Sequence, residues 1–187
     1  MVPYKLLTGL LVASLLSINW RISKTRRVST KIPDSINPDA VIQALHDHKA
    51  FIALNPVIVD LTQVQTDPVI YENEWFQTPE TQDPIETYMI NSIITIIPVS
   101  YWGKHHIQFP TWLRNTETGV KTKADAPLGV IVGSQLSVQP ENTGGWMLVV
   151  DLNVKCVWWV MPFVAWTYDQ VYANIVRDLL KSQEGGI

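Results

Sequence analysis

The sequence predicts one α+β domain in which an antiparallel sheet is followed by a long C-terminal helix. The chain has 187 residues, which is enough for one domain with a substantial core and short for two. Between residues 57 and 160, β-branched and aromatic runs alternate with turn signals, as in a meander of antiparallel strands. From residue 163 to 181 the apolar residues instead recur at helical spacing.

The first part of the domain is predicted to form a strand and then a helix. Residues 27–32 alternate polar and apolar side chains and stop at Pro33, which is typical of a short strand. Pro38, preceded by a cap residue, suits the first turn of a helix whose spacing continues to about residue 50. An Asn-Pro pair then turns the chain, because the residue before a proline avoids helical geometry.

About six further strands are predicted between this helix and the C-terminal one. They are rich in β-branched and aromatic residues and span 57–64, 69–77, 86–102, 104–113, 119–124 with 129–138, and 145–160. The last is the clearest, because alternate residues from Trp146 to Trp158 are apolar while Asp151, Asn153 and Lys155 have the opposite parity. One face of that strand is therefore expected to meet the protein interior.

The composition argues against several classes of function. Hydrophobic residues make up 47% of the chain and charged residues 17%, which is typical of a globular domain that buries a large apolar interior. The net charge is −3 and no basic stripe is interleaved with aromatic residues, so no nucleic-acid partner is expected. Cys156 is the only cysteine, and no zinc-ligand spacing, phosphate loop or dinucleotide fingerprint is present. We therefore expect no metal and no cofactor.

An apolar N-terminal segment, residues 1–24, precedes the ligand-binding domain expected over residues 25–183. Leu6 to Ile18 is an almost uninterrupted apolar run, and basic residues follow it. Three interpretations stay open: a membrane anchor or interfacial helix, a signal peptide, or a helix packed on the domain. The charge order favours an anchor, with membrane contact through residues 4–20. Without a disulfide or a glycosylation site, an intracellular location is favoured, and secretion is the remaining alternative.

The order of elements resembles the helix-grip fold of the START-like superfamily, which includes birch-pollen-allergen relatives and polyketide cyclase and lipid-transfer branches. The segments ALHDH at 44–48 and FIALNPV at 51–57 are similar to the LHDH…LNP opening of a fungal START-like family. The resemblance runs from about residue 26 to residue 180. It implies a curved sheet wrapped around the C-terminal helix, with a cavity that usually holds a sterol, lipid, polyketide or similar ligand. It implies no particular activity.

Two residues are expected to carry chemistry if the domain is an enzyme. His105 shares strand parity with the apolar residues that follow it, which places it inside as a general acid or base, although a hydrogen-bonded sheet histidine fits the same pattern. Asn73 shares a face with Tyr71 and Trp75 in the predicted strand 69–77, where it would orient a ligand carbonyl.

Two other candidates have simpler structural explanations. His46 and His48 flank Asp47, but residues two apart on a helix point in nearly opposite directions and do not share a metal easily. Helix capping and surface hydrogen bonding are expected for this cluster. Cys156 has no basic neighbour in the sequence that would lower its pKa, so a place in the core is expected.

The ligand is expected to contact side chains of the last strand, the C-terminal helix and the predicted strand 69–77. The set comprises Tyr71, Trp75, Trp146, Leu148, Val150, Leu152, Val154, Cys156, Trp158, Tyr168, Val171, Tyr172 and Ile175. The chain has eight tryptophans, which suit an aromatic-lined site, although a well-filled core uses them equally.

Two functions fit these features, and both have a hydrophobic small molecule as the partner. The favoured hypothesis is a cofactor-free cyclase or isomerase that holds a secondary metabolite, of polyketide or terpenoid type, in a reactive conformer. Such catalysis needs shape more than reactive side chains, and the sequence has no recognisable triad or metal site. The alternative is a non-catalytic protein that binds or transfers a lipid or sterol. Neither hypothesis predicts an oligomeric state.

Overall fold

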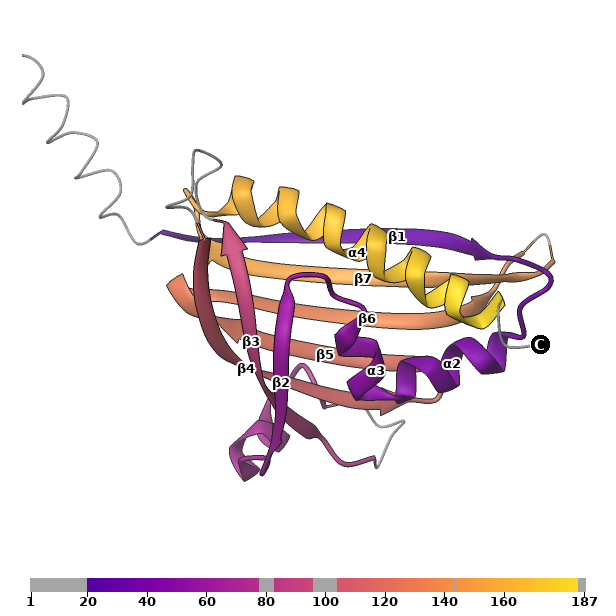
Figure 1. Ribbon diagram of the computed structural model, residues 1–187, viewed down its shortest axis with the longest axis horizontal. Helices are drawn as coiled ribbons and strands as arrows, with labels where there is room; N and C mark the ends of the chain where they lie inside the picture. The colour runs from indigo at the N-terminus through magenta and orange to yellow at the C-terminus, as the bar shows by residue number, and fades with distance from the viewer. Residues whose placement is uncertain (1–19, 78–82, 96–103, 143, 185–187) are drawn as a thin grey trace, which may run out of the picture.

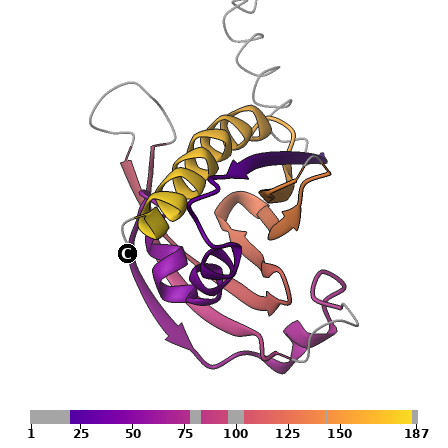
Figure 2. The same cartoon turned by 90° about the vertical axis from the view of Figure 1, so that its right-hand side faces the viewer.

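The structure, a computed structural model, describes residues 20–77, 83–95, 104–142 and 144–184, with the side chains of all of these except 94, 95, 104 and 105. Seven antiparallel strands form one curved open sheet in the order β1-β7-β6-β5-β4-β3-β2. The strands are β1 (Arg21–Ile32), β2 (Ile58–Val64), β3 (Glu86–Thr95), β4 (Lys104–Thr116), β5 (Gly119–Ala126), β6 (Val130–Pro140) and β7 (Trp146–Val157). The sheet curls around the long helix α4 (Met161–Glu184), which confirms the predicted α+β class (Figure 1 and Figure 2).

Strand β1 pairs with the last strand of the chain, β7, along its whole length. Arg21 lies opposite Val157, and Ile32 lies opposite Trp146. The strand therefore begins six residues before the predicted start at residue 27, so residues 21–24 belong to the sheet and not to the N-terminal segment.

The apolar run expected to contact a membrane falls in residues 1–19, which lie outside the described residues. Within the part of the chain that the structure describes, no helix is both long and apolar enough to cross a membrane.

The predicted helix ending near residue 50 consists of two helices, α2 (Pro38–His46) and α3 (His48–Ala53). They meet at Asp47, whose side chain accepts a hydrogen bond from the Ala50 amide at 3.1 Å and caps α3. Asn37 caps α2 in the same way through the Asp39 amide. The expected capping role of Asp47 is confirmed.

His46 ties α2 to the turn between β4 and β5. Its Nε2 atom lies 3.1 Å from the carbonyl oxygens of both Thr116 and Gly119, so a proton on this nitrogen is shared between two backbone acceptors. This contact joins residues about 70 positions apart in the sequence and fixes where α2 lies against the strands next to the β4–β5 turn.

His48 is the centre of a buried network, so the expected surface position is wrong for this residue. It is only 5% exposed. Its Nδ1 lies 2.8 Å from Glu86 Oε2 and its Nε2 lies 2.7 Å from Asn115 Oδ1. The Tyr88 hydroxyl donates to the same Glu86 oxygen at 2.6 Å. Burial acts to raise the pKa of Glu86, but the hydrogen bonds from Tyr88 and His48 outweigh it and hold that pKa below its ordinary value.

The strand predicted over 69–77 is wrong, because this segment forms the short 3-10 helix η1 (Pro68–Glu72) and then a turn. Asp67 caps η1 by accepting a hydrogen bond from the Val69 amide, and Pro68 suits the first helical position. These start signals dominate over the β-propensity of the aromatic residues that follow.

The core closes one end of the curved sheet and leaves the other end less filled. The second half of α4 packs against α2 and the sheet in one cluster that includes Leu45, Leu136 and Leu179. The first half of α4 belongs to a smaller cluster with Val154 and Val164. Helices α2 and α3 lie beneath only the second half of α4, and this asymmetry positions the cavity described below (Figure 1).

The buried network predicts that His48→Ala destabilises the domain by about 2–4 kcal/mol, since the change removes two hydrogen bonds and leaves a buried void. Urea unfolding followed by tryptophan fluorescence measures this. Gln43→Ala, at an exposed position of α2, serves as the control and should stay within about 0.5 kcal/mol of the unchanged protein. Equal losses in the two variants would show that the network contributes nothing specific.

Candidate functional site

An apolar cavity lies between the first half of α4 and the concave face of the sheet. Its outer chamber has a volume of about 500 Å³, and its walls include Ile107, Leu128, Trp159, Phe163 and Val164. An inner chamber of about 100 Å³ has walls that include Ile90, Leu113, Val132 and Ile175. The two chambers adjoin, because the same five residues line both: Asn55, Ile58, Phe109, Tyr168 and Val171.

Side chains from one face of a strand and one face of a helix line the cavity. In β4, Phe109 and Leu113 have the same parity and point to the concave face. In α4, Val164, Tyr168 and Val171 fall on one helical face and meet them from above. The large side chains on both surfaces face each other across the cavity. Phe51 and Ile52 of α3 form part of the inner wall, whereas no residue of α2 or α3 lines the outer chamber.

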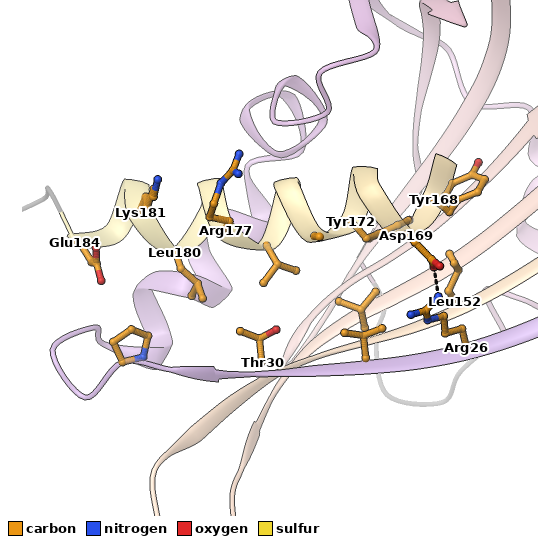
Figure 3. Close-up of a pocket in the computed structure, with 15 residues that line it drawn as sticks. Arg26, Thr30, Leu152, Tyr168, Asp169, Tyr172, Arg177, Leu180, Lys181 and Glu184 are labelled. Atoms are coloured by element: carbon orange, nitrogen blue, oxygen red, sulfur yellow. Dashed lines mark ion pairs between the residues drawn. The ribbon is translucent and has the colours of Figure 1, made fainter. Parts of the chain in front are cut away.

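A separate depression, the α4–β1 groove, lies on the other side of α4 (Figure 3). It has a volume of about 540 Å³ and an apolar floor formed by Val28, Val150 and Leu152. Its rim is charged, and Arg26 forms an ion pair with Asp169 across one end (Figure 3). Because an apolar ligand there would meet ionic groups along the rim, the groove suits such a ligand less well than the chambers do.

Two tyrosines separate the groove from the chambers. Tyr168 and Tyr172 stack with their ring centroids 5.9 Å apart, and both residues line the inner chamber and the groove. Burial raises the pKa of Tyr168, and the neighbouring Tyr172 and Cys156 add to that effect. Burial also raises the pKa of Tyr172, although hydrogen bonds with Ser134 and Thr122 partly offset it. Both hydroxyls are therefore neutral at ordinary pH.

Four hydroxyl groups lie on the floor of the inner chamber and next to it. Thr122 Oγ1 and Ser134 Oγ are 2.6 Å apart, and the Tyr172 hydroxyl lies within hydrogen-bonding reach of both. Thr111 also lines this chamber, and its hydroxyl is buried without a hydrogen-bond partner among the described residues. These groups can donate to or accept from a ligand oxygen without carrying charge.

Residues 22–185 match the family described as Domain of unknown function (DUF7053). The chain belongs to this family. Comparison with curated proteins finds no match.

Solved structures share the fold of this DUF7053 domain at low sequence identity. Ara h 8.0201 is 11% identical, with a TM-score of 0.53 over 86% of this chain and 99% of that chain. The di-domain ARO/CYC StfQ from the steffimycin biosynthetic pathway is 9% identical, with a TM-score of 0.57 over 87% of this chain and 51% of that chain. An uncharacterized protein from Rhizobium leguminosarum is 9% identical, with a TM-score of 0.51 over 89% of this chain and 99% of that chain. The START-like helix-grip fold is thereby confirmed, while the resemblance to a fungal family stays a prediction.

The structure distributes the expected ligand-binding residues of β7 and α4 over three environments. Val171 and Ile175 line the chambers, Val150 and Leu152 line the groove, and the two tyrosines face both. Two groups do not line either space: the buried core residues Leu148, Val154 and Cys156, and the partly exposed Trp146 and Trp158 at the ends of β7. Cys156 Sγ packs 4.0 Å from Met161 Sδ, and burial raises the pKa of its thiol, as expected of a core cysteine.

Tyr71, Asn73 and Trp75 lie away from the chambers, because the segment that carries them is not a strand. Trp75 covers Gly133 on the face of the sheet turned away from α4, where a β carbon on residue 133 would approach the indole ring to 2.9 Å. Asn73 accepts a hydrogen bond from the Trp75 amide, and the Tyr71 hydroxyl accepts one from the Ile85 amide. These contacts stabilise the turn after η1.

His105 is the other expected catalytic residue. Its backbone belongs to β4 and pairs with Ile94, but its side chain lies outside the described residues. Its neighbour His106 lines the outer chamber. Sequence reasoning missed most residues that line the chambers, Thr111, Thr122 and Phe163 among them. Strand parity carried two residues beyond Phe109 would have identified Thr111, whereas Thr122 and Phe163 needed the three-dimensional arrangement.

The buried tyrosines predict a loss of stability in alkali. Because Tyr168 and Tyr172 stay protonated in the folded chain but ionise near pH 10 when unfolded, the free energy of unfolding falls above that pH by up to about 1.4 kcal/mol per pH unit for each. A double Tyr168→Phe, Tyr172→Phe variant should show a shallower fall between pH 10 and 11 in urea unfolding. Below pH 9 the two proteins should have the same pH dependence, and parallel curves above pH 10 would contradict the prediction.

Proposed function

We propose that this domain binds an apolar small molecule in its two chambers and carries it without chemical change. The observation that supports this is the chamber lining, which combines apolar side chains with Ser, Thr, Asn and Tyr residues and a single described histidine, His106. Among the described residues, no Asp, Glu, Lys or Arg side chain lines either chamber. The outer chamber has the volume of a small-molecule site, and an apolar ligand entering it buries apolar surface against the chamber walls.

An exposed apolar rim at the chamber mouth supports delivery at a membrane. Leu128 is 54% exposed and Trp159 is 39% exposed, and both line the outer chamber. Leu128 has a φ of 62°, a left-handed conformation that costs energy for a leucine. Trp158 and Trp20 are also exposed, and the Trp158 amide donates to the Trp20 carbonyl at 2.9 Å, so the start of β1 adjoins the rim. Exposed tryptophans of this kind are typical of surfaces that enter a lipid interface.

A cofactor-free cyclase or isomerase is the second candidate, and the hydroxyls of the inner chamber favour it. Tyr172, with Thr122 and Ser134 beside it, would polarise a carbonyl while the chambers hold the substrate in a bent conformer. His105 stays part of this second proposal as an acid or base. Asn73 does not, because it lies on the opposite face of the sheet.

The chambers, and not the groove, should hold the ligand. Val171→Trp places an indole ring where the two chambers adjoin, so it should weaken the binding of the neutral apolar dye N-phenyl-1-naphthylamine by at least about tenfold. Ala173→Trp, on the groove side of the same helix, is the matched control and should change the affinity less than about twofold. Fluorescence titration measures both, with melting temperatures to confirm folding. The reverse result would place the ligand in the groove.

Transfer to membranes should depend on the rim. Leu128→Asp with Trp159→Ala should slow dye transfer to phosphatidylcholine vesicles by roughly tenfold, because these side chains no longer enter the interface. Because both side chains also line the outer chamber, the affinity in solution is measured in parallel, and transfer rates are compared at equal occupancy of the protein by the dye. Trp146→Ala, at the opposite end of β7, is the control and should transfer at the normal rate.

Mass spectrometry of ligands that co-purify with the protein distinguishes the two candidate functions. An unchanged lipid or sterol supports the carrier, whereas a substrate and its cyclised or isomerised product together support the enzyme and contradict the carrier.

A further inference from the structure

The floor of the inner chamber identifies the chemical class of the ligand. We infer that the ligand is an uncharged molecule with one hydrogen-bonding oxygen, a hydroxyl or a ketone, which binds with this oxygen in the inner chamber and its apolar body in the outer chamber. The inference deepens the proposed function and rests on it.

The first argument is the absence of a counter-charge. The polar residues that line the inner chamber are Asn55, Thr111, Thr122, Tyr168 and Tyr172, all of them uncharged. A carboxylate or an ammonium group placed there would lose its hydration without gaining an ion pair from any described residue. Molecules whose polar end is ionic at neutral pH are therefore disfavoured.

The second argument is the presence of hydroxyls that a pure hydrocarbon would leave unused. Thr122 lies directly opposite Ser134 in the sheet, and Thr111 is the diagonal neighbour of Thr122 on the next strand. Thr111 is only 7% exposed, and its hydroxyl has no partner in the described structure. A buried hydroxyl without a partner costs free energy that a ligand oxygen recovers. An alcohol or ketone therefore satisfies this floor better than either an ion or a hydrocarbon.

The third argument is the difference in size between the chambers. The inner chamber, at about 100 Å³, accommodates an oxygen and a few neighbouring carbon atoms, whereas the outer chamber is about 500 Å³. The outer walls are largely apolar, with Trp159, Phe163 and Ile107 among them. The larger, apolar part of the ligand therefore fits only the outer chamber. The polar end then lies in the inner chamber, deeper in the cavity.

Three probes on one ring system test the ligand class in the full-length chain: 2-acetylnaphthalene, 2-naphthoate and naphthalene. At pH 7.5, where naphthoate is an anion, calorimetry should give the ketone an affinity at least roughly thirtyfold above that of naphthoate. The ketone should also bind about three- to tenfold more tightly than naphthalene, which has the same rings without the oxygen.

Two threonine variants test where the oxygen binds. Thr111→Val keeps the side-chain shape and removes the hydroxyl, so it should remove most of the preference for the ketone over naphthalene while leaving naphthalene affinity unchanged or higher. Thr116→Val is the matched control, because Thr116 also has a buried hydroxyl without a partner but does not line either chamber. It should leave the affinities for all three probes unchanged.

The outcomes separate the inference from the proposed function. Equal or tighter binding of naphthoate, or equal binding of naphthalene and the ketone, overturns the ligand class while the apolar site stands. A Thr111→Val variant that keeps the full preference for the ketone overturns the assigned position of the oxygen. If none of the three probes binds, the proposed function fails, and the inference fails with it.

Discussion

The architecture depends on how α4 is held against a sheet that is too strongly curved for one helix to fill. At one end, α2 occupies the remaining space, and Leu45, Leu136 and Leu179 close a continuous core. At the other end no described residue of α2 or α3 lines the outer chamber, so Phe163 and Val164 meet the sheet across an open space. The packed second half of α4 holds the whole helix in position. The first half can therefore border a cavity without loss of the fold.

Among the described residues, no Asp, Glu, Lys or Arg side chain lines this hollow, and His46 and His48 lie away from it. His48, the first residue of α3, contacts Glu86 and Asn115 through its two ring nitrogens, and His46 is held by the backbone of the β4–β5 turn. Both histidines of the LHDH segment therefore connect the helices to the sheet. In the inner chamber the hydrogen-bonding side chains are instead hydroxyls and an amide, and the outer chamber adds His106 at its wall. This division lets the domain fix its helices with strong polar contacts and keep a cavity in which an uncharged ligand loses little hydration.

The entrance of the outer chamber carries exposed apolar side chains, which bear on the choice between the two candidate functions. A closed cavity would serve a catalyst that must exclude water, whereas Leu128 and Trp159 place apolar surface at the entrance itself. The strained backbone at Leu128 keeps that side chain outward at an energetic cost, which purely structural packing does not require. The same hydroxyls that would hold a ligand oxygen would polarise a carbonyl, so the carrier and the enzyme differ in reactivity and not in the mode of binding.

Local patterns in the sequence determined the elements wherever periodicity was strong. The alternation in β7 and the helical spacing in α4 predicted both elements, because each reflects a single buried face. The prediction of a strand over residues 69–77 was wrong, since the capping contacts of Asp67 outweighed the β-propensity of Tyr71 and Trp75.

Only the tertiary structure decided which inward-facing residues line a cavity and which fill the core. Val171 and Cys156 both lie on a predicted inner face, yet one borders a chamber and the other packs on Met161. The difference arises from the curvature of the sheet and the tilt of α4, which depend on contacts between distant residues that no local pattern contains.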